Sequence, residues 1–359
     1  MRIAAVDVVP YALPFAAPYV SARGRLDRRE LVMVRLRTGE EVEGLGETVV
    51  LSLRGGRSLG EIERQIRELA APKLVGIEME ADPPGTVPSV SRGLSREAAT
   101  AVDTARLDLA AKLVDQPLWR LLGAKRAEPV PCNATLVAGN PGEVAADARR
   151  WAKRGFSSFK LKVGVPGDVE QVGAVREAVG PEARIRVDAN GVWSPEQAVE
   201  RLAAMEPFGI ELAEQPAADL EELALVRART AIPIAADESI ASVDDARRAL
   251  ELGSCQLATV KLPKVGGIGP ARSIADALPV YLSSALDGPV GVAAAAHLAQ
   301  ALPAARFAGA LAHGLATQLL FTGTVASTEC EVHDGMLHLP EGPGLGVEID
   351  EHALERHRL

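Results

Sequence analysis

From about residue 129 onward the chain repeats one pattern, a short apolar run followed by a polar helical segment, and this pattern constrains the fold most. The eight apolar runs are VPCNATL, SFKLKV, RIRVDA, IELAEQP, IPIAADES, LATVKLP, LPVYLSS and ARFAGAL. Segments such as PGEVAADARRWAKRG and SPEQAVERLAAM separate them. Eight strand–helix units in roughly 200 residues predict a parallel (β/α) barrel. An open doubly wound sheet is the alternative, but no Gly-rich phosphate-binding fingerprint follows the first run.

Residues 1–128 have a different sequence pattern, which predicts an α+β unit. RIAAVDVVPYALP and ELVMVRLRT are predicted strands, and Gly39-Glu40 is a predicted turn into EVEGLGETV. Helices are expected over 58–74 and over 95–123, where Ser95 would cap the second helix and Gly123 would end it. The tail over 326–359 is predicted to form strands and turns. We therefore divide the chain into 1–128, 129–325 and 326–359.

The bulk composition excludes several classes of partner. The net charge is −9 and no long basic run is present, which argues against nucleic acid and anionic membranes as partners. The longest low-charge stretch, VGVAAAAHLAQAL, is too short to span a bilayer, and the N-terminus does not have the pattern of a signal peptide. Three widely spaced cysteines are typical of core thiols in a reducing compartment, so we expect a cytoplasmic protein. A homo-oligomer remains open.

Each of the five middle runs ends in a charged residue. These residues are Lys162, Asp188, Glu214, Asp237 and Lys261, and they follow one another at intervals of 23 to 26 residues. One interval is about one strand–helix unit, so each charge occupies the carboxyl end of its strand. In a parallel barrel these ends lie at one mouth, where active sites form. The series therefore predicts a cluster of two bases and three acids at that mouth.

Three carboxylates at one point repel one another unless a cation neutralises them. Oxygen-only ligands on rigid strands suit Mg²⁺, and no His or Cys joins the set, which argues against zinc. The stretch FKLKVG also places Lys160 and Lys162 on one face of a strand. A neighbouring ammonium and a metal ion would both lower the pKa of Lys162 and favour its neutral, basic form. The alternative is that the lysines only neutralise the acidic neighbours.

A metal ion beside a lysine base suits one kind of chemistry. The lysine can remove a weakly acidic proton α to a carboxylate, and the metal can stabilise the enediolate charge that develops. The expected partner is therefore a small-molecule carboxylate.

The motifs KLK, VDAN, EQP, ADES and VKLPKVGG stand in the order and spacing of the enolase superfamily, and the chain resembles its muconate-lactonising subgroup over nearly its whole length. The resemblance implies a (β/α)₇β barrel under an α+β capping domain built from the N-terminal region and the C-terminal tail. It implies Mg²⁺, or Mn²⁺ in its place, on Asp188, Glu214 and Asp237, with Lys162 and Lys261 as the acid/base pair. Supporting roles are implied for Lys160, Asn190 and Glu238. A simple ion pair is the alternative for Glu238.

The reaction is narrowed by two further segments. LPVYLSSALDGPVG and AHGLATQLLFTGTV resemble the o-succinylbenzoate synthases of the menaquinone pathway. The resemblance implies that Ser283 and Ser284, with the adjoining helix N-terminus, hold the succinyl carboxylate of the substrate, although serines at a strand end are also ordinary caps.

Other activities stay open beside the synthase. The loop SARGRLDRREL resembles racemases and muconate cycloisomerases more closely, so an N-succinylamino acid racemase or a muconate-type cycloisomerase is the alternative. Arg23 and Arg25 of that loop would then meet a substrate carboxylate or be solvated. A non-catalytic binding or structural barrel is a third hypothesis, but it would be expected to lack at least one of the five charges.

Overall fold

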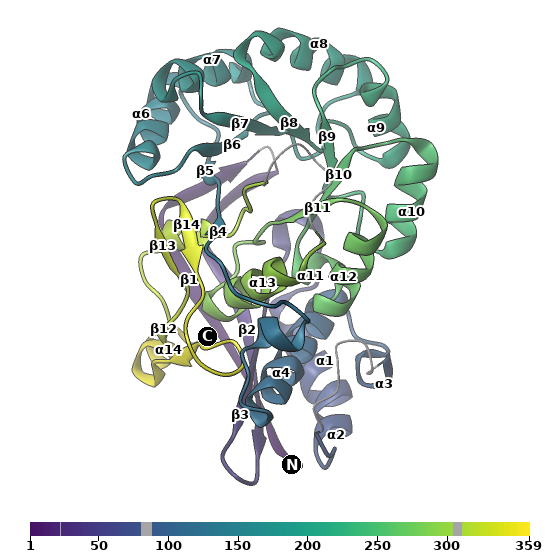
Figure 1. Cartoon of the computed structure of the whole chain (residues 1–359), viewed down its shortest axis with the longest axis vertical. Helices are drawn as coiled ribbons and strands as arrows, with labels where there is room; N and C mark the ends of the chain where they lie inside the picture. Colours follow the sequence, from purple (N-terminus) through teal and green to yellow (C-terminus); the bar gives the residue numbers. More distant parts are fainter. Residues whose placement is uncertain (22, 80–87, 304–310) are drawn as a thin grey trace.

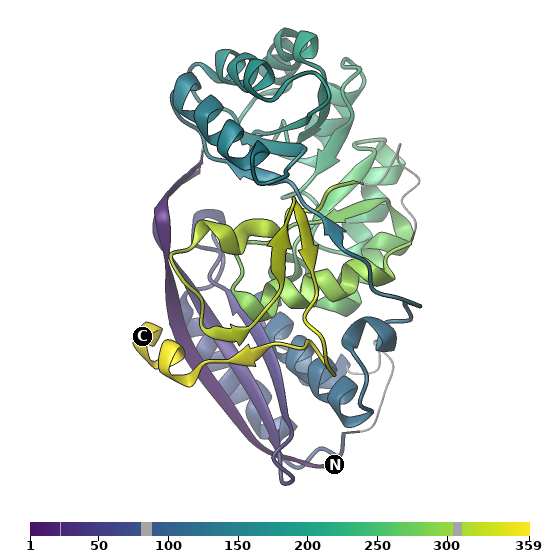
Figure 2. The ribbon, with the colours of Figure 1, turned by 60° about the vertical axis from the view of Figure 1, so that its left-hand side comes forward.

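The computed structural model describes residues 1–21, 23–79, 88–303 and 311–359. A three-stranded antiparallel sheet forms the first unit, in the order β1 (Ile3–Ser21), β2 (Gly24–Thr38) and β3 (Glu43–Val49). The predicted strands and the turn at 39–40 are confirmed. β1 and β2 are long and pair through a register shift between Pro14 and Tyr19, and their shared tip reaches the barrel (Figures 1 and 2).

Helices pack on one face of this sheet. The predicted first helix is present as α1 (Leu59–Gln65), a π-helical turn (Ile66–Ala70) and α2 (Ala71–Leu74), and the short α3 (Pro88–Ser91) precedes α4 (Arg96–Leu113). The side chain of Ser95 accepts from the amide of Ala98 and caps the start of α4, as predicted. Gly46 on β3 lets α4 approach closely, because a Cβ there would lie 1.9 Å from the carbonyl oxygen of Ala101.

The expected single helix over 95–123 is wrong in its second half. The chain leaves helical geometry at Val114, and a separate short helix, α5 (Leu118–Leu121), follows. Asp115 has φ +51°, and Pro117 has no amide hydrogen for a helical bond and restricts the residue before it. Gly123, with φ +95°, ends α5.

Seven parallel strands form the main sheet, in the order β11-β10-β9-β8-β7-β6-β5. The strands are β5 (Ala134–Leu136), β6 (Ser158–Lys162), β7 (Arg184–Asp188), β8 (Ile210–Glu214), β9 (Ile234–Ala236), β10 (Leu257–Val260) and β11 (Val280–Leu282). Outside them lie α6 (Pro141–Ala152), α7 (Asp168–Val179), α8 (Pro195–Met205), α9 (Leu220–Arg227), α10 (Val243–Leu252), α11 (Leu262–Val265), α12 (Ile268–Ala277) and α13 (Pro289–Ala301). Figure 1 shows the strands curling inside an arc of these helices.

His313 and Gly314 join the two edges of this curled sheet. The amide of Gly314 donates to the carbonyl of Leu282 at the end of β11, and the amide of Asn133, just before β5, donates to the carbonyl of His313. Both bridges are parallel. These residues therefore take the eighth position of a closed barrel. Most of the predicted eighth run, ARFAGAL, lies outside the described residues.

The C-terminal segment returns along the barrel to the first sheet (Figure 2). A 3₁₀ turn (Ala316–Leu320) leads to β12 (Ala326–Thr328), β13 (Glu331–His333), β14 (Met336–His338), β15 (Glu348–Ile349) and α14 (Glu351–His357). β14 pairs with β4 (Val130–Pro131), and the amide of Leu359 donates to Pro10 on β1. The strands were predicted, but α14 was not. The division at 128 and 325 stays a prediction.

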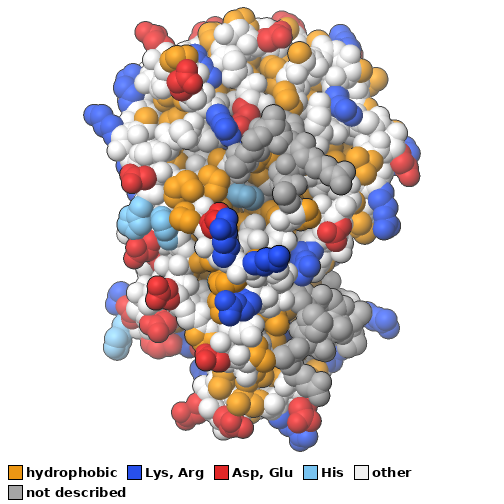
Figure 3. All heavy atoms as spheres, in the orientation of Figure 1, with side chains coloured by type: hydrophobic (Ala, Val, Ile, Leu, Met, Phe, Trp, Pro, Cys, Tyr) orange, Lys and Arg blue, Asp and Glu red, His pale blue; other side chains and the backbone are white. Residues whose placement is uncertain are grey.

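The core follows this architecture. One large apolar cluster fills the space between the barrel strands and their helices, and a second fills the space between β1–β3 and helices α1 and α4. On the face in Figure 3, acidic and basic side chains are interspersed. Among the described residues, no helix combines the length and the apolar character needed to cross a membrane.

Candidate active site

The five charged residues of the repeat lie together at one mouth of the barrel. Lys162, Asp188 and Glu214 are the last residues of β6, β7 and β8, and they are direct neighbours in the strand register. Asp237 and Lys261 follow immediately after β9 and β10. All five side chains are buried. The two lysines therefore flank three carboxylate-bearing strands, in the order that the sequence suggested.

Asp188 is the common partner of two lysines. Its Oδ2 lies 2.9 Å from Nζ of Lys160 and 2.5 Å from Nζ of Lys162. Burial alone would raise the pKa of Asp188, but the two ammonium groups hold it well below its usual range. The two lysines of FKLKVG thus point to the same face, and both contact a carboxylate.

Glu214 lies in a more crowded electrostatic environment. Nζ of Lys160 is 2.7 Å from its Oε1, and the hydroxyl of Tyr281 donates to its Oε2. Burial and the nearby negative charge of Asp188 nevertheless raise the pKa of Glu214, and Asp237 adds to this effect. Burial would lower the pKa of Lys160, but Asp188 and Glu214 raise it well above its usual range. The three carboxylates are close enough to repel one another.

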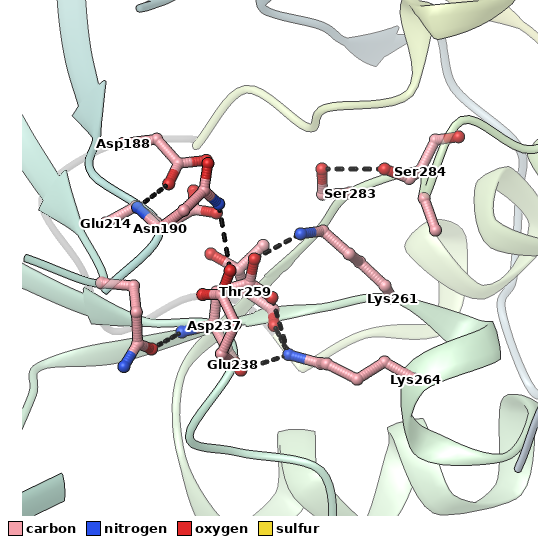
Figure 4. A network of polar contacts seen from close by, with 12 residues as sticks. Asp188, Asn190, Glu214, Asp237, Glu238, Thr259, Lys261, Lys264, Ser283 and Ser284 are labelled. Atoms are coloured by element: carbon pink, nitrogen blue, oxygen red, sulfur yellow. Dashed lines mark hydrogen bonds and ion pairs between the residues drawn. The ribbon is translucent and has the colours of Figure 1, made fainter. Parts of the chain in front are cut away.

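Asp237 is held from the far side of the mouth. Nζ of Lys261 donates to its Oδ2, and Nζ of Lys264 lies 2.8 Å from its Oδ1. Lys264 also donates to the carbonyl of Thr259 at 2.9 Å. Figure 4 shows Lys261 and Lys264 approaching from the side opposite Asp188 and Glu214.

Two residues with unusual backbone angles shape the loops after β7 and β8. Asn190 has φ +51° and Gln215 has φ +40°, a region that non-glycine residues rarely adopt. Oδ1 of Asn190 accepts from Lys162 at 3.1 Å, and its Nδ2 donates to Oε1 of Glu238 at 3.0 Å. Oε1 of Gln215 accepts from the amide of Asp237 at 2.7 Å. These side chains connect neighbouring strand ends across the mouth.

Ser283 and Ser284 line the same cavity but differ from the expectation in one respect. The hydroxyl of Ser284 donates to Oδ2 of Asp287 at 2.8 Å and accepts from the amide of Asp287 at 2.7 Å, so it is engaged within its own turn. The amides of Gly288 and Gly291, at the start of α13, donate to Glu47 of β3. These two amides are therefore not available to a substrate carboxylate.

A cavity of about 770 Å³, open solvent included, lies over the charged residues. One side is polar and carries Lys160, Lys162, Lys261 and Asn190. The first unit and the loop after β11 add apolar side chains, and Arg23 and Arg29 stand among them: Leu26, Leu51, Leu53, Ala285 and Leu286. The cavity can therefore take a molecule with an anionic end and an apolar body.

The tip of the β1–β2 hairpin covers part of this cavity. Nε and Nη2 of Arg23 donate to the carbonyl of Asn190 at 3.0 and 2.7 Å. Arg25, in contrast, is exposed and pairs with Asp27 at 2.8 Å. Of the two arginines expected to meet a substrate, Arg23 reaches the site and Arg25 does not, and Arg29 of the same segment also lines the cavity.

The donor set suits a hard divalent cation. The oxygens of Asp188, Glu214 and Asp237 are buried, come from adjacent strand ends and repel one another, and such oxygens are the ligands that Mg²⁺ prefers. In this structure ammonium groups contact each carboxylate, and no group of three His, Cys, Asp or Glu side chains in the described ranges is arranged to hold an ion. Metal binding by these residues stays a prediction.

Lys264 and Tyr281 were missed by the sequence reasoning. Lys264 stands three residues after Lys261, so one helical turn could have indicated it. Tyr281 sits two residues before Ser283 in an apolar run, where a tyrosine gives no signal of its own.

Comparison with known proteins identifies the class. A model of the enolase C-terminal domain-like family matches residues 143–353, and a model of the mandelate racemase / muconate lactonizing enzyme N-terminal domain matches residues 3–123. The chain belongs to the enolase superfamily, and the predicted (β/α)₇β fold is confirmed.

Its relatives have several activities. The N-succinyl-L-Arg/Lys racemase of Bacillus cereus is 30% identical, over 99% of this chain and 97% of the relative. The o-succinylbenzoate synthase of Thermobifida fusca is 41% identical over 192 residues, which is 52% of this chain and 60% of the relative. The crystal structure of muconate lactonizing enzyme from Pseudomonas fluorescens superposes with a TM-score of 0.93 at 28% identity, over 100% of this chain and 99% of the other. The chain is therefore an enzyme of the mandelate racemase/muconate lactonizing type.

Proposed function

We propose that this enzyme removes a proton α to the carboxylate of a small substrate, with Mg²⁺ as cofactor. The observation that carries the proposal is the cluster at the barrel mouth. Two lysines on β6 and after β10 flank three buried carboxylates beneath one cavity. Membership in the enolase superfamily supports the same class of chemistry.

In this proposal Asp188, Glu214 and Asp237 hold the metal ion. When bound, Mg²⁺ would stabilise the negative charge that develops on the substrate carboxylate. Mn²⁺ offers similar coordination and would substitute. The lysine ammonium groups that now contact the three carboxylates would move toward the cavity, where their Nζ atoms can meet substrate.

Lys162 is the proposed base. Lys162 lines the cavity, and its Nζ is held by Asp188 and Asn190. Lys160 shares Asp188 with it, so a second ammonium group lies beside the proposed base. Lys261 faces the substrate from the opposite side of the mouth.

The specific reaction we propose is the o-succinylbenzoate synthase dehydration of menaquinone synthesis. Lys162 takes the α proton and then gives a proton to the leaving hydroxyl, which departs as water, while Lys261 balances the charge of the intermediate. Three features support this choice: the 41% identity to the Thermobifida fusca synthase, the serines Ser283 and Ser284 at the cavity wall, and the apolar wall that fits a carbocyclic ring. Of the two serines, Ser283 is the freer to meet a carboxylate.

Racemisation of N-succinylamino acids is the second candidate. Lys162 ends β6 and Lys261 follows β10, so the two lysines flank the three carboxylates from different strands, and proton delivery to two faces of a substrate needs two such groups. The full-length likeness to the Bacillus cereus racemase favours it as well. A muconate-type cycloisomerase remains a third use of the same residues.

The deciding experiment compares the two leading reactions on the same purified enzyme. It should be given the succinyl-hydroxycyclohexadiene carboxylate of menaquinone synthesis and, separately, N-succinylated amino acids in D₂O. Deuterium exchange alone decides nothing, because both reactions begin with the same proton. The ratio of the two kcat/KM values is decisive, since specificity is differential binding of transition states. Efficient racemisation beside negligible dehydration would overturn the synthase assignment.

A further inference from the structure

The interior of this barrel contains polar side chains below the site. Barrel interiors are usually filled by branched aliphatic residues. Here Arg186 of β7 and Tyr281 of β11 are among the largest fully buried side chains of the chain. Tyr281 packs with a small apolar cluster of Leu212, Ala235, Leu257 and Leu311. A buried guanidinium and phenol require partners, and these partners form a continuous series.

The series begins at Glu214. The hydroxyl of Tyr281 donates to Oε2 of Glu214, the same carboxylate that Lys160 contacts at 2.6 Å. Beneath the phenol, Cζ of Arg186 lies 4.9 Å from the centroid of its ring. The guanidinium therefore supports the ring from its face, which is a favourable cation–π arrangement in a desolvated site.

Arg186 is itself fixed. Its Nε donates to Oε2 of Glu211 at 2.5 Å, and its Nη1 donates to the carbonyl of Ala312 at 2.6 Å. The strand register shifts at this point, because Ile185 pairs with Ile210 whereas Arg186 pairs with Leu212. Glu211 is the extra residue, and a bulge of this kind redirects a side chain. This bulge explains how Glu211 reaches Arg186 although its neighbour Leu212 faces the barrel interior.

We propose that Tyr281 is a positioning residue for Glu214. A glutamate side chain has three rotatable bonds, and one at a strand end needs a fixed partner to present its carboxylate in one orientation. The phenol provides that partner, and Arg186 keeps the phenol in place. The proposal rests on the proposed function, because it takes Glu214 as a metal ligand. Residues that orient metal ligands typically change metal affinity by about 10–100-fold when they are altered.

Tyr281→Phe is the direct test. It removes the hydroxyl and keeps the ring that packs on Arg186. We expect the dissociation constant for Mn²⁺, measured by electron paramagnetic resonance of the free ion, to rise about 10-fold or more. We also expect kcat/KM to fall and to recover in part at saturating metal. An unchanged dissociation constant in a folded Tyr281→Phe protein would refute the proposal.

Tyr11→Phe is the matched control. Tyr11 is also fully buried, and its hydroxyl also donates to a buried glutamate, Glu47, at 2.6 Å, but it lies in the first sheet away from the metal ligands. It should lower stability without changing the Mn²⁺ dissociation constant. If both variants weakened Mn²⁺ binding equally, the effect would be general loosening, and the proposal would be wrong.

A second measurement does not depend on the folding of the variant at 281. The chain has three tyrosines, so protein labelled with 3-fluorotyrosine gives three ¹⁹F resonances. Tyr11→Phe and Tyr19→Phe each remove one resonance and assign the third to Tyr281. Mg²⁺ should shift the Tyr281 resonance and leave that of Tyr11 unchanged, and no shift at Tyr281 would refute the proposal. If the unaltered protein binds no Mn²⁺ at all, the result refutes the proposed function, in which Glu214 is a metal ligand, and with it the role of Tyr281.

Discussion

Glu47 is a buried carboxyl group, and the structure predicts that its ionisation destabilises the folded protein. It lies on β3 where the first sheet meets the start of α13, and 1% of its surface is exposed. Its oxygens accept from the hydroxyl of Tyr11 at 2.6 Å and from the amides of Gly288 at 2.7 Å and Gly291 at 3.2 Å. The charged group facing it from the barrel is Asp287.

Burial raises the pKa of Glu47 from 4.5 to about 8, against the opposing effect of the Tyr11 bond and with a contribution from Asp287. The folded protein therefore binds this proton more tightly than the unfolded chain does. The stability associated with Glu47 is complete below pH 4.5 and is lost as the pH rises to about 8. At about 1.36 kcal/mol per pH unit, the loss reaches on the order of 4–5 kcal/mol above pH 8.

Glu47→Gln measures this effect, because glutamine resembles the protonated carboxyl group in shape and hydrogen bonding. Its oxygen can accept from both glycine amides, and its NH₂ group can donate to the oxygen of Tyr11. Urea unfolding at pH 5, 7 and 9 should give similar free energies for the two proteins at pH 5. At pH 7 the variant should be more stable by about 3 kcal/mol, and at pH 9 by about 4–5 kcal/mol.

Tyr11 and Asp287 are present in both proteins, so the difference between them isolates Glu47. Glu40→Gln, on the exposed turn after β2, is the control and should not change the pH dependence. The reasoning is wrong if Glu47→Gln is less stable than the unaltered protein by a constant amount at all three pH values. That result would mean that Tyr11 and the two amides are sufficient to keep Glu47 ionised.

Three other predictions concern the site and its frame. Lys162→Ala and Lys261→Ala should each lower kcat by about 10²–10⁴-fold with the circular dichroism spectrum unchanged; the exposed Lys125→Ala is the control, and a loss below tenfold would place the base elsewhere. Exhaustive EDTA treatment should abolish turnover, and added Mg²⁺ should restore it. The Asp237→Asn variant should need more Mg²⁺ to reach its half-maximal rate. Full activity after chelation would exclude a role for the metal. Asp108→Ala should lower the free energy of unfolding in urea by about 2–4 kcal/mol. The amides of Leu45 and Leu345, now 2.7 and 2.6 Å from the Asp108 oxygens, would lose their acceptor. A smaller loss would mean that water replaces the carboxylate as acceptor.

The sequence predicted the barrel and the cluster at its mouth for one physical reason. Parallel strands bring equivalent positions of successive units to the same edge, so a charge repeated every 23 to 26 residues must converge in space. Asp188 and Glu214 are register partners because of that repeat. Periodicity along the chain is enough to predict such a cluster.

Other features depend on contacts that periodicity does not encode. The break at Asp115 needs a left-handed backbone conformation that the helical pattern of its neighbours conceals. The orientation of Glu211 comes from a shift in strand register. The contact between Glu47 and the start of α13 depends on how the first sheet packs on the barrel. Each arises between segments that are distant in the sequence.

Residues 10–11 and residues 358–359 form one local structure, and this has a consequence for biosynthesis. The amide of Leu359 bonds to Pro10, and Tyr11 forms a bridge with Arg358. A ribosome adds about 5–20 residues per second, so β1 emerges roughly 20–70 s before its last partner exists. During that interval an edge of β1 offers unpaired backbone groups to any neighbouring strand. Nascent chains of this protein are therefore expected to need protection at β1 until residues 358–359 have been synthesised.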